Sequence, residues 1–446
     1  MSRKAKIALV GLGGGVALAA LVVVAIANSG TGRLDGIAKR HGIPTSAEQL
    51  KALCKVPEAE NAYPLYLRYR DADKTESAAA PKGLDFPSFG MTMRGTASSV
   101  SASKFLFDPA ATAGYLGRFP LSLHTAEAMA NRSEWFVDRD MSDPIMTQYP
   151  ELADLKRATK LLVLEAELKL ARGDHQGAME EYRKASQVAD FANSEPTLIG
   201  TLVYIACRSV VLTSIAHEAP VIAADRVAEQ KAMKLLDGIK QPNLGLAMKG
   251  EGFLVYFEAK HGVPPAVMQD GDPGLSTRSN SDSDPVEERP DVMAINATRG
   301  LWGPEVLEQT GRSVDSAQGN DYRRFVDEQG NLDKWLGGTG IAQTVAGFLV
   351  PVFSQAGLAC EKLLASRDLV RIGLTALASR RPPSVVGAVD PFSLRPYKVV
   401  PLAHGWEVYS FGTDGVDGGG VIDRSSPGQT KDLIFSYDGK AFLVGR

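Results

Sequence analysis

A long uncharged stretch of apolar and small residues opens the chain. It covers residues 7–27 and follows three cationic side chains, those of Arg3, Lys4 and Lys6. About twenty such residues suffice for a helix to cross a bilayer, and cations before the span favour a cytoplasmic N-terminus. We therefore predict a single-pass anchor in the inner membrane, with the bulk of the chain outside the cytoplasm. The alternative is a cleaved signal peptide, since Ala25–Ala27 has the small-residue pattern of a cleavage site.

Two periodic apolar stretches in the middle of the chain predict a helical hairpin. The break between them falls at Gly173 and Asp174, where the glycine would end one helix and the aspartate would cap the next. The second helix resembles that of a tetratricopeptide repeat, with Ala178, Tyr182 and Ala185 at the matching spacing. The sequence contains no second copy. One hairpin cannot bury its own apolar face, so a further helix must cover it.

The segment that follows, residues 197–219, is apolar nearly all round and could supply this cover. Arg208 stands at its centre, and a charge there costs about 2.5 to 3.5 kcal/mol on insertion into a membrane. We therefore predict a buried core helix whose arginine pairs with Glu165 or Glu167 of the adjoining helix. Residues 341–360 carry no charge; an internal proline favours a kinked amphipathic helix, and a second membrane crossing is the alternative.

Turn-forming residues and short strands complete the pattern. A capped helix should start at Thr45 or Ser46, and another near Asn61. Residues 71–100 and the acidic stretch 269–290 are predicted as long loops. From Asp390 onward, short apolar runs separated by Gly, Pro and Asp predict a small antiparallel sheet, with an Asp438–Gly439 turn in its last hairpin.

These elements define an α+β fold that is mainly α. The body carries one tetratricopeptide-like hairpin, and the sheet closes the chain. The expected divisions are an anchor (1–30), N-terminal helices with a long loop (31–110), the helical body (111–268), an acidic loop with short helices (269–334), and a helix followed by the sheet (335–446).

Composition limits the function. The 446 residues carry a formal net charge of −3, so no overall positive field exists for a nucleic acid. The three cysteines are far apart in the sequence, and the six histidines stand alone, without the spacings of zinc or nucleophile motifs. An enzyme would need a site assembled by the fold, and we lean towards a protein without catalytic activity.

The chain as a whole resembles a broad, largely uncharacterised family of bacterial single-anchor membrane proteins. The stretches that carry this resemblance are "GIPTSAEQL", "ENAYPLY", "ARGDHQGAMEEYRKASQVADFANSEPTLIG", "DPFSLRPYKVV" and "KDLIFS". The resemblance implies an N-terminal anchor, a helical body and a β-tail, and it implies no assigned reaction.

The tail "WEVYSFGTDGVDGGG" is similar to the calcium-binding end of the major pseudopilin of type II secretion. Calcium takes six to eight oxygen ligands from carboxylates and carbonyls. The carboxylates of Asp414, Asp417 and Asp432 could provide them, and the glycines let carbonyls turn inward. The resemblance implies Asp414 and Asp432 as the better ligands, with the Phe411 carbonyl; Asp417 and Asp423 are further candidates. The alternative is a simple glycine–aspartate turn.

The departures from the pilin pattern bear on function. The anchor lacks the phenylalanine and glutamate of a prepilin processing site, and about three hundred residues separate it from the pilin-like tail. We therefore do not expect the chain to polymerise as a pilin subunit. The anchor, the repeat-like hairpin and the lack of a catalytic motif instead predict a membrane-anchored scaffold or assembly factor of the cell envelope with a protein partner. The alternatives are an envelope hydrolase and an accessory component of a secretion or pilus-like system.

Overall fold

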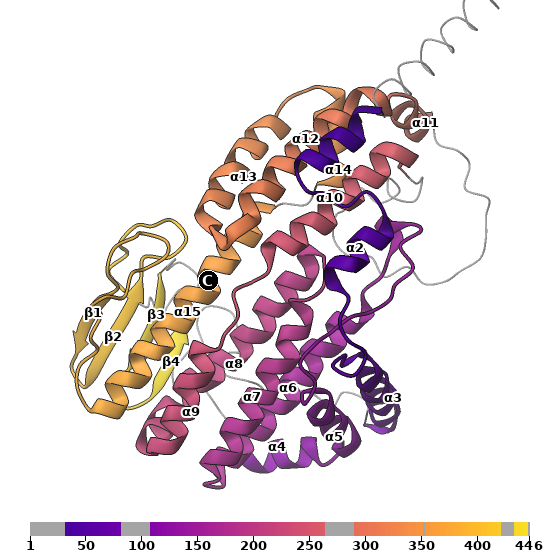
Figure 1. Cartoon of the computed structure of the whole chain (residues 1–446). Helices are drawn as coiled ribbons and strands as arrows, with labels where there is room; N and C mark the ends of the chain where they lie inside the picture. The colour runs from indigo at the N-terminus through magenta and orange to yellow at the C-terminus, as the bar shows by residue number, and fades with distance from the viewer. Residues whose placement is uncertain (1–31, 82–107, 264–289, 351–352, 421–431, 445–446) are drawn as a thin grey trace, which may run out of the picture.

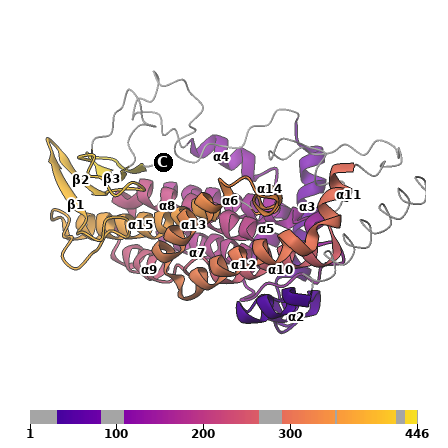
Figure 2. The ribbon, with the colours of Figure 1, turned by 90° about the horizontal axis from the view of Figure 1, so that it is seen from above.

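The computed structural model describes residues 32–81, 108–263, 290–350, 353–420 and 432–444. The predicted anchor, most of the acidic loop and Asp423 lie outside these residues. Figure 1 shows a helical body with a small sheet packed against its later helices. Seen from above, the sheet lies at one end of the body and α3 and α11 lie towards the other (Figure 2).

The first helices and the hairpin body come in the following order. They are residues 32–40, α2 (Ala47–Cys54), α3 (Tyr63–Ala79), α4 (Pro109–Leu116), α5 (Pro120–Met129), η1 (Pro144–Met146), α6 (Pro150–Ala171), α7 (His175–Ala192), α8 (Leu198–Ala224), α9 (Arg226–Asp237) and α10 (Leu244–His261). The later helices are α11 (Pro290–Ala297), α12 (Arg299–Ala317), η3 (Gln318–Asn320), α13 (Tyr322–Leu336), α14 (Ile341–Leu349) and α15 (Phe353–Ser379).

The predicted hairpin is confirmed as α6 and α7, which pack side by side. Gly173 adopts φ +81°, a left-handed conformation that suits glycine at a helix end. The Asp174 side chain then accepts a hydrogen bond from the backbone N–H of Gly177 and caps α7. The expected cap of α2 is also present, at Ser46.

The excursion expected from Asp71 onward begins later than predicted, because α3 continues to Ala79. Residues 71–79 are mostly good helix formers, and no proline interrupts the helix before Pro81. Local polarity alone therefore gave the wrong boundary.

The covering helix is α8, which packs against α6, α7 and α15. Arg208 on α8 pairs with Asp190 on α7, so the expected partners Glu165 and Glu167 were wrong. Glu167 instead accepts a hydrogen bond from Ser214. Within the described part of the chain, α8 is the one helix whose length and hydropathy would permit a membrane crossing; 56% of its most apolar window is buried in the protein.

Residues 341–360 belong to two helices. The first, α14, ends at Leu349, and α15 begins at Phe353. They therefore lack the single continuous helix that the alternative of a second membrane crossing requires.

The sheet is confirmed as a four-stranded antiparallel meander in the order β1-β2-β3-β4. Its strands are β1 (Lys398–Leu402), β2 (Gly405–Ser410), β3 (Leu433–Tyr437) and β4 (Ala441–Val444). One face packs on α15, where Gly373 leaves room for the Phe435 ring; a Cβ at this glycine would lie 2.4 Å from it. The end strand β4 contacts α8.

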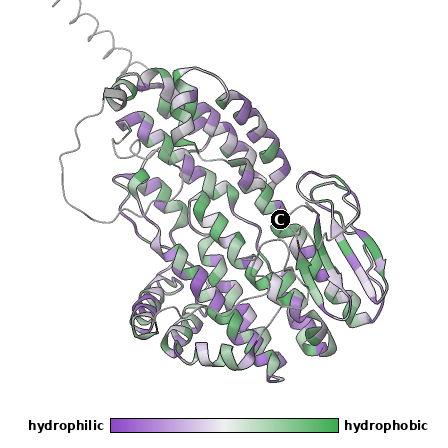
Figure 3. Cartoon of the chain, turned by 180° about the vertical axis from the view of Figure 1, so that it is seen from behind, coloured by the Kyte–Doolittle hydropathy of each residue, from purple (hydrophilic) through white to green (hydrophobic). Residues whose placement is uncertain are grey.

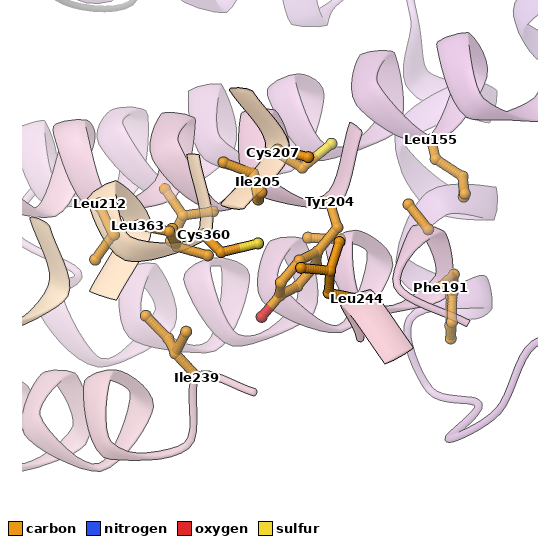
Figure 4. Close-up of a cluster of buried hydrophobic side chains, with 14 of the residues drawn as sticks. Leu155, Phe191, Tyr204, Ile205, Cys207, Leu212, Ile239, Leu244, Cys360 and Leu363 are labelled. Atoms are coloured by element: carbon orange, nitrogen blue, oxygen red, sulfur yellow. The ribbon is translucent and has the colours of Figure 1, made fainter. Parts of the chain in front are cut away.

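One hydrophobic core joins the helices to the sheet, with members from Leu34 to Ala441. Hydrophobic and hydrophilic residues alternate along many of the helices, as amphipathic packing requires (Figure 3). Figure 4 shows Tyr204 of α8 with Cys360 and Leu363 of α15 in this apolar interior.

Candidate functional site

The glycine-rich loop after β2 holds two of the predicted calcium ligands. Asp417 accepts hydrogen bonds from the Tyr409 hydroxyl (2.8 Å) and the Gly419 backbone N–H (3.0 Å) through Oδ1. Its Oδ2 pairs with the Lys398 ammonium. The bond from Lys398 is the main reason that the pKa of Asp417 falls to about 2. Asp414 is exposed and caps the Val416 backbone N–H at 3.1 Å.

Asp432 lies behind this loop, at the start of β3. It is buried, and its Oδ2 accepts from the Gly420 N–H at 3.1 Å. Burial raises the pKa of this carboxyl above its usual value. Phe411 is buried as well, with its ring beneath the cations of Arg395 and Lys398.

Within the described residues, no group of three or more His, Cys, Asp or Glu side chains could hold a metal ion. Residues 421–431, which join Gly420 to Asp432 and include Asp423, lie outside them. The calcium site therefore stays a prediction. The structure shows that Asp414, Asp417 and Asp432 each already accept hydrogen bonds.

A second region, which the sequence did not single out, is a pocket between α2 and two connecting segments. Its walls are Leu50, Lys51 and Cys54 of α2, Trp135, Phe136, Val137, Arg139 and Met141, and Ser194, Glu195 and Pro196 between α7 and α8. The Asn61 side chain fixes one wall by bonding both the carbonyl and the N–H of Phe136. Packing and hydrogen bonds thus hold the pocket in shape.

The buried side chains of Arg139 and Glu195 form the floor of this pocket, and Arg139 also pairs with Glu151, which does not line it. Arg139 pairs with Glu151, in the first turn of α6, and with Glu195, 2.8 Å away. All three side chains are at least nine-tenths buried. The Arg139 guanidinium also lies 4.4 Å from the centroid of the Tyr149 ring. An arginine shared in this way is held rigidly and leaves one negative charge uncompensated.

Glu195 is the acid that faces the pocket. Its Oε1 accepts from the Trp135 indole N–H (2.6 Å) as well as from Arg139. Burial raises the pKa of Glu195 above its usual value, and the charge of Arg139 acts in the opposite direction. Glu251, which is partly exposed, lies close enough to raise the pKa of the same Tyr149 side chain.

Cys54 lines the pocket from α2. Burial raises the pKa of its thiol to about 12, and the negative charge of Glu195 adds to the effect. The neutral thiol dominates at physiological pH, so this side chain is a poor nucleophile. The pocket is therefore equipped to accept hydrogen bonds and a positive charge.

The pocket residues come from segments about 140 positions apart, with no shared motif. Trp135 and Arg139 stand in a stretch of mixed polarity, and Glu195 follows a helix end. Comparison of the chain with models of protein families, with curated proteins and with solved structures gave no match. The resemblances seen in the sequence therefore stay interpretations.

Proposed function

We propose that this protein is a membrane-anchored extracytoplasmic scaffold or assembly factor of the cell envelope, which binds a protein partner along its helical body. The observation that supports this proposal is an apolar stripe on the outer face of α8. We define the α8 stripe as Ile199, Leu202, Val203, Ala206 and Val210.

The α8 stripe follows helical geometry. Each member is three or four positions from at least one other member, so they lie on one side of the helix. Ile199 is 47% exposed and Leu202 is 40% exposed, and the other three are partly exposed. The opposite side of α8 is buried in the core. A helix with a second apolar side facing solvent is typical of a protein–protein contact.

The charge beside the α8 stripe indicates the kind of partner. Lys156 on α6 lies near Cys207, which follows Ala206 in α8. Lys156 forms no ion pair with any other described residue. A partner that presents an apolar helix side with acidic residues along one margin would complement this surface.

A photo-crosslinking amino acid at Leu202 tests the binding surface in the intact native host. We expect a discrete protein adduct from Leu202. The same probe at Leu121 of α5, which is 58% exposed, should give none. Ile199→Asp in the Leu202 probe strain should abolish the adduct, because it places a desolvated charge in the contact. Equal adducts from both positions, or none from Leu202, would count against partner binding here.

The placement of the bulk of the chain outside the cytoplasm is tested separately. A C-terminal epitope should become sensitive to added protease in spheroplasts while a cytoplasmic marker stays intact. A protected epitope would overturn the extracytoplasmic placement.

A further inference from the structure

The pocket between α2 and the Arg139 floor has the dimensions of a site for a small polar group. It encloses about 330 Å³ when the space at its open mouth is counted. Its enclosed part has room for about one water-sized group. The lining includes the buried apolar side chains of Leu50, Trp135 and Met141.

The charges around this space leave an excess of one negative charge. Lys51 at the rim is paired with Asp138, at 2.6 Å. Arg139 is opposed by both Glu151 and Glu195. A positive group entering the pocket would therefore balance the charge, and an anionic group would be repelled.

One carboxylate oxygen of Glu195, Oε2, has no hydrogen-bond donor among the described residues. Both donors that reach this carboxylate, Trp135 and Arg139, bond to Oε1. The Glu195 side chain as a whole is only 4% exposed, so Oε2 has little access to water, and a donor that enters the pocket could bond to it.

We propose that this pocket binds a primary ammonium group through Glu195. An ammonium group is about as large as water, carries the missing positive charge and offers three N–H donors. Its alkyl chain would lie against the apolar part of the lining, at Leu50, Trp135 and Met141. A guanidinium is too broad for the enclosed space. The amine belongs either to a small aliphatic molecule or to a lysine side chain of a partner protein; the second case rests on the proposed scaffold function.

Cys54 provides a built-in reporter of occupancy. It lines the pocket and is partly exposed, whereas Cys207 and Cys360 are buried. Because burial keeps the Cys54 thiol neutral, its alkylation is slow, and long incubation of the full-length protein followed by peptide mass spectrometry measures access to the pocket. We expect n-butylamine, protonated at neutral pH, to slow this alkylation about fivefold when present at several times its Kd. Tetramethylammonium, which has no N–H donor, and n-butanol should have no effect at the same concentration and ionic strength.

Variants test the role of Glu195. Glu195→Gln should abolish protection, and Glu180→Gln, at a half-exposed acid of α7, should leave it unchanged. Lys51→Ala, at the partly exposed rim, should strengthen protection because it removes a positive charge beside the pocket and leaves the Asp138 carboxylate unpaired. If Glu195→Gln fails to fold, Lys51→Ala still tests the proposal.

One peptide, compared with n-butylamine, distinguishes the sources of the amine. An acetylated, amidated Gly-Lys-Gly peptide that protects better than n-butylamine identifies a lysine side chain, and the reverse order identifies a small amine. Equal protection by tetramethylammonium, or no protection by any amine, overturns the proposal and leaves a water-filled pocket. Crosslinking through Leu202 in the otherwise wild-type protein separates this result from the scaffold proposal, because failure of the scaffold proposal removes that adduct, whereas failure of the pocket proposal alone leaves it intact.

Discussion

Glu258 shows how a single buried acid can set the response of a fold to pH. Its side chain is fully buried on α10, and neither carboxylate oxygen has a hydrogen-bond partner. Burial raises its pKa to about 8, with a smaller contribution from the charge of Asp143. The folded protein therefore keeps this carboxyl protonated at pH values where the unfolded chain has released the proton.

This difference predicts the direction of the pH dependence. Between about pH 4.5 and 8 the folded state binds more protons at Glu258 than the unfolded state, so the unfolding free energy falls as pH rises. Glu167 and Glu361, with pKa values raised to about 7 by burial, act in the same direction. Glu258→Gln should flatten the slope and stabilise the protein at about pH 8.5 by about 2–4 kcal/mol relative to the wild type.

Urea unfolding of the full-length protein at about pH 5 and about pH 8.5 measures this effect. Glu180→Gln, at a half-exposed position, serves as the control and should not change the slope. If Glu258→Gln lowers stability equally at both pH values, the wild-type carboxyl is not held protonated by burial.

The pair of Arg208 and Asp190 gives a second prediction at the scale of single residues. Both side chains are buried, and removing one leaves the other charge uncompensated, at a cost of about 3–5 kcal/mol. We expect Arg208→Met to lose an amount near the lower value, because Lys240 also lies 3.5 Å from Asp190. The double variant Arg208→Met/Asp190→Leu should recover at least half of the loss. Additive losses in urea unfolding would contradict this account.

At the scale of elements, the sequence was most informative where local chemistry decides the structure. Gly173 and Asp174 marked the break between α6 and α7 because a left-handed glycine and a capping aspartate act within a few residues. The strands and the Asp438–Gly439 turn were visible for the same reason. The end of α3 could not be predicted from the sequence, since the polar residues after Asp71 are compatible with both helix and loop.

The turn before β1 contains strain that the sequence did not reveal. Leu394 adopts φ +57°, which costs a non-glycine residue about 1–2 kcal/mol. Asp390 fixes this turn: its carbonyl accepts from Leu394 N–H (2.9 Å), and its side chain accepts from Ser393 and Ser410. The surrounding hydrogen bonds therefore hold an exposed leucine in an unfavourable conformation.

Leu394→Gly should relieve this strain. Glycine adopts positive φ freely but loses more chain entropy on folding, so we expect a net gain of about 0.5–1 kcal/mol. Val386→Gly is the matched control, since Val386 is more exposed and lacks a positive φ. It should be neutral or destabilising. Thermal melts of the two variants compare the effects, and a loss at Leu394 as large as that at Val386 would show that the turn stores no strain.

At the scale of the whole molecule, the sequence did not predict which side chains from distant segments come into contact. A buried arginine on α8 required an acid, but three acids on two helices were compatible with the pattern, and only packing selected Asp190. The Glu195 pocket depends likewise on bringing α2 beside the segment after α5 and the end of α7. Such juxtapositions follow from the arrangement of helices, which periodicity does not encode.

The last prediction concerns calcium and the tail. The sheet packs on α15 and α8, so the full-length protein is the proper material. If calcium binds the glycine loop of the folded form alone, it should stabilise the protein by about 1.4 kcal/mol at ten times its Kd, with millimolar metal filling a site of the extracellular type. Magnesium should do little, because it requires tighter octahedral geometry.

The structure adds a sharper test, because Lys398 already occupies Asp417. A calcium ion at this carboxylate must displace the ammonium group, so Lys398→Met should increase the calcium-dependent rise in melting temperature. Asp414→Asn and Asp432→Asn should reduce it, since each removes a charged ligand. His404→Ala, at an exposed position between β1 and β2, is the control and should leave the calcium effect unchanged. A melting temperature that is equal in calcium and in chelator, for both the wild type and Lys398→Met, would mean that the loop is a turn stabilised by Lys398 and binds no calcium.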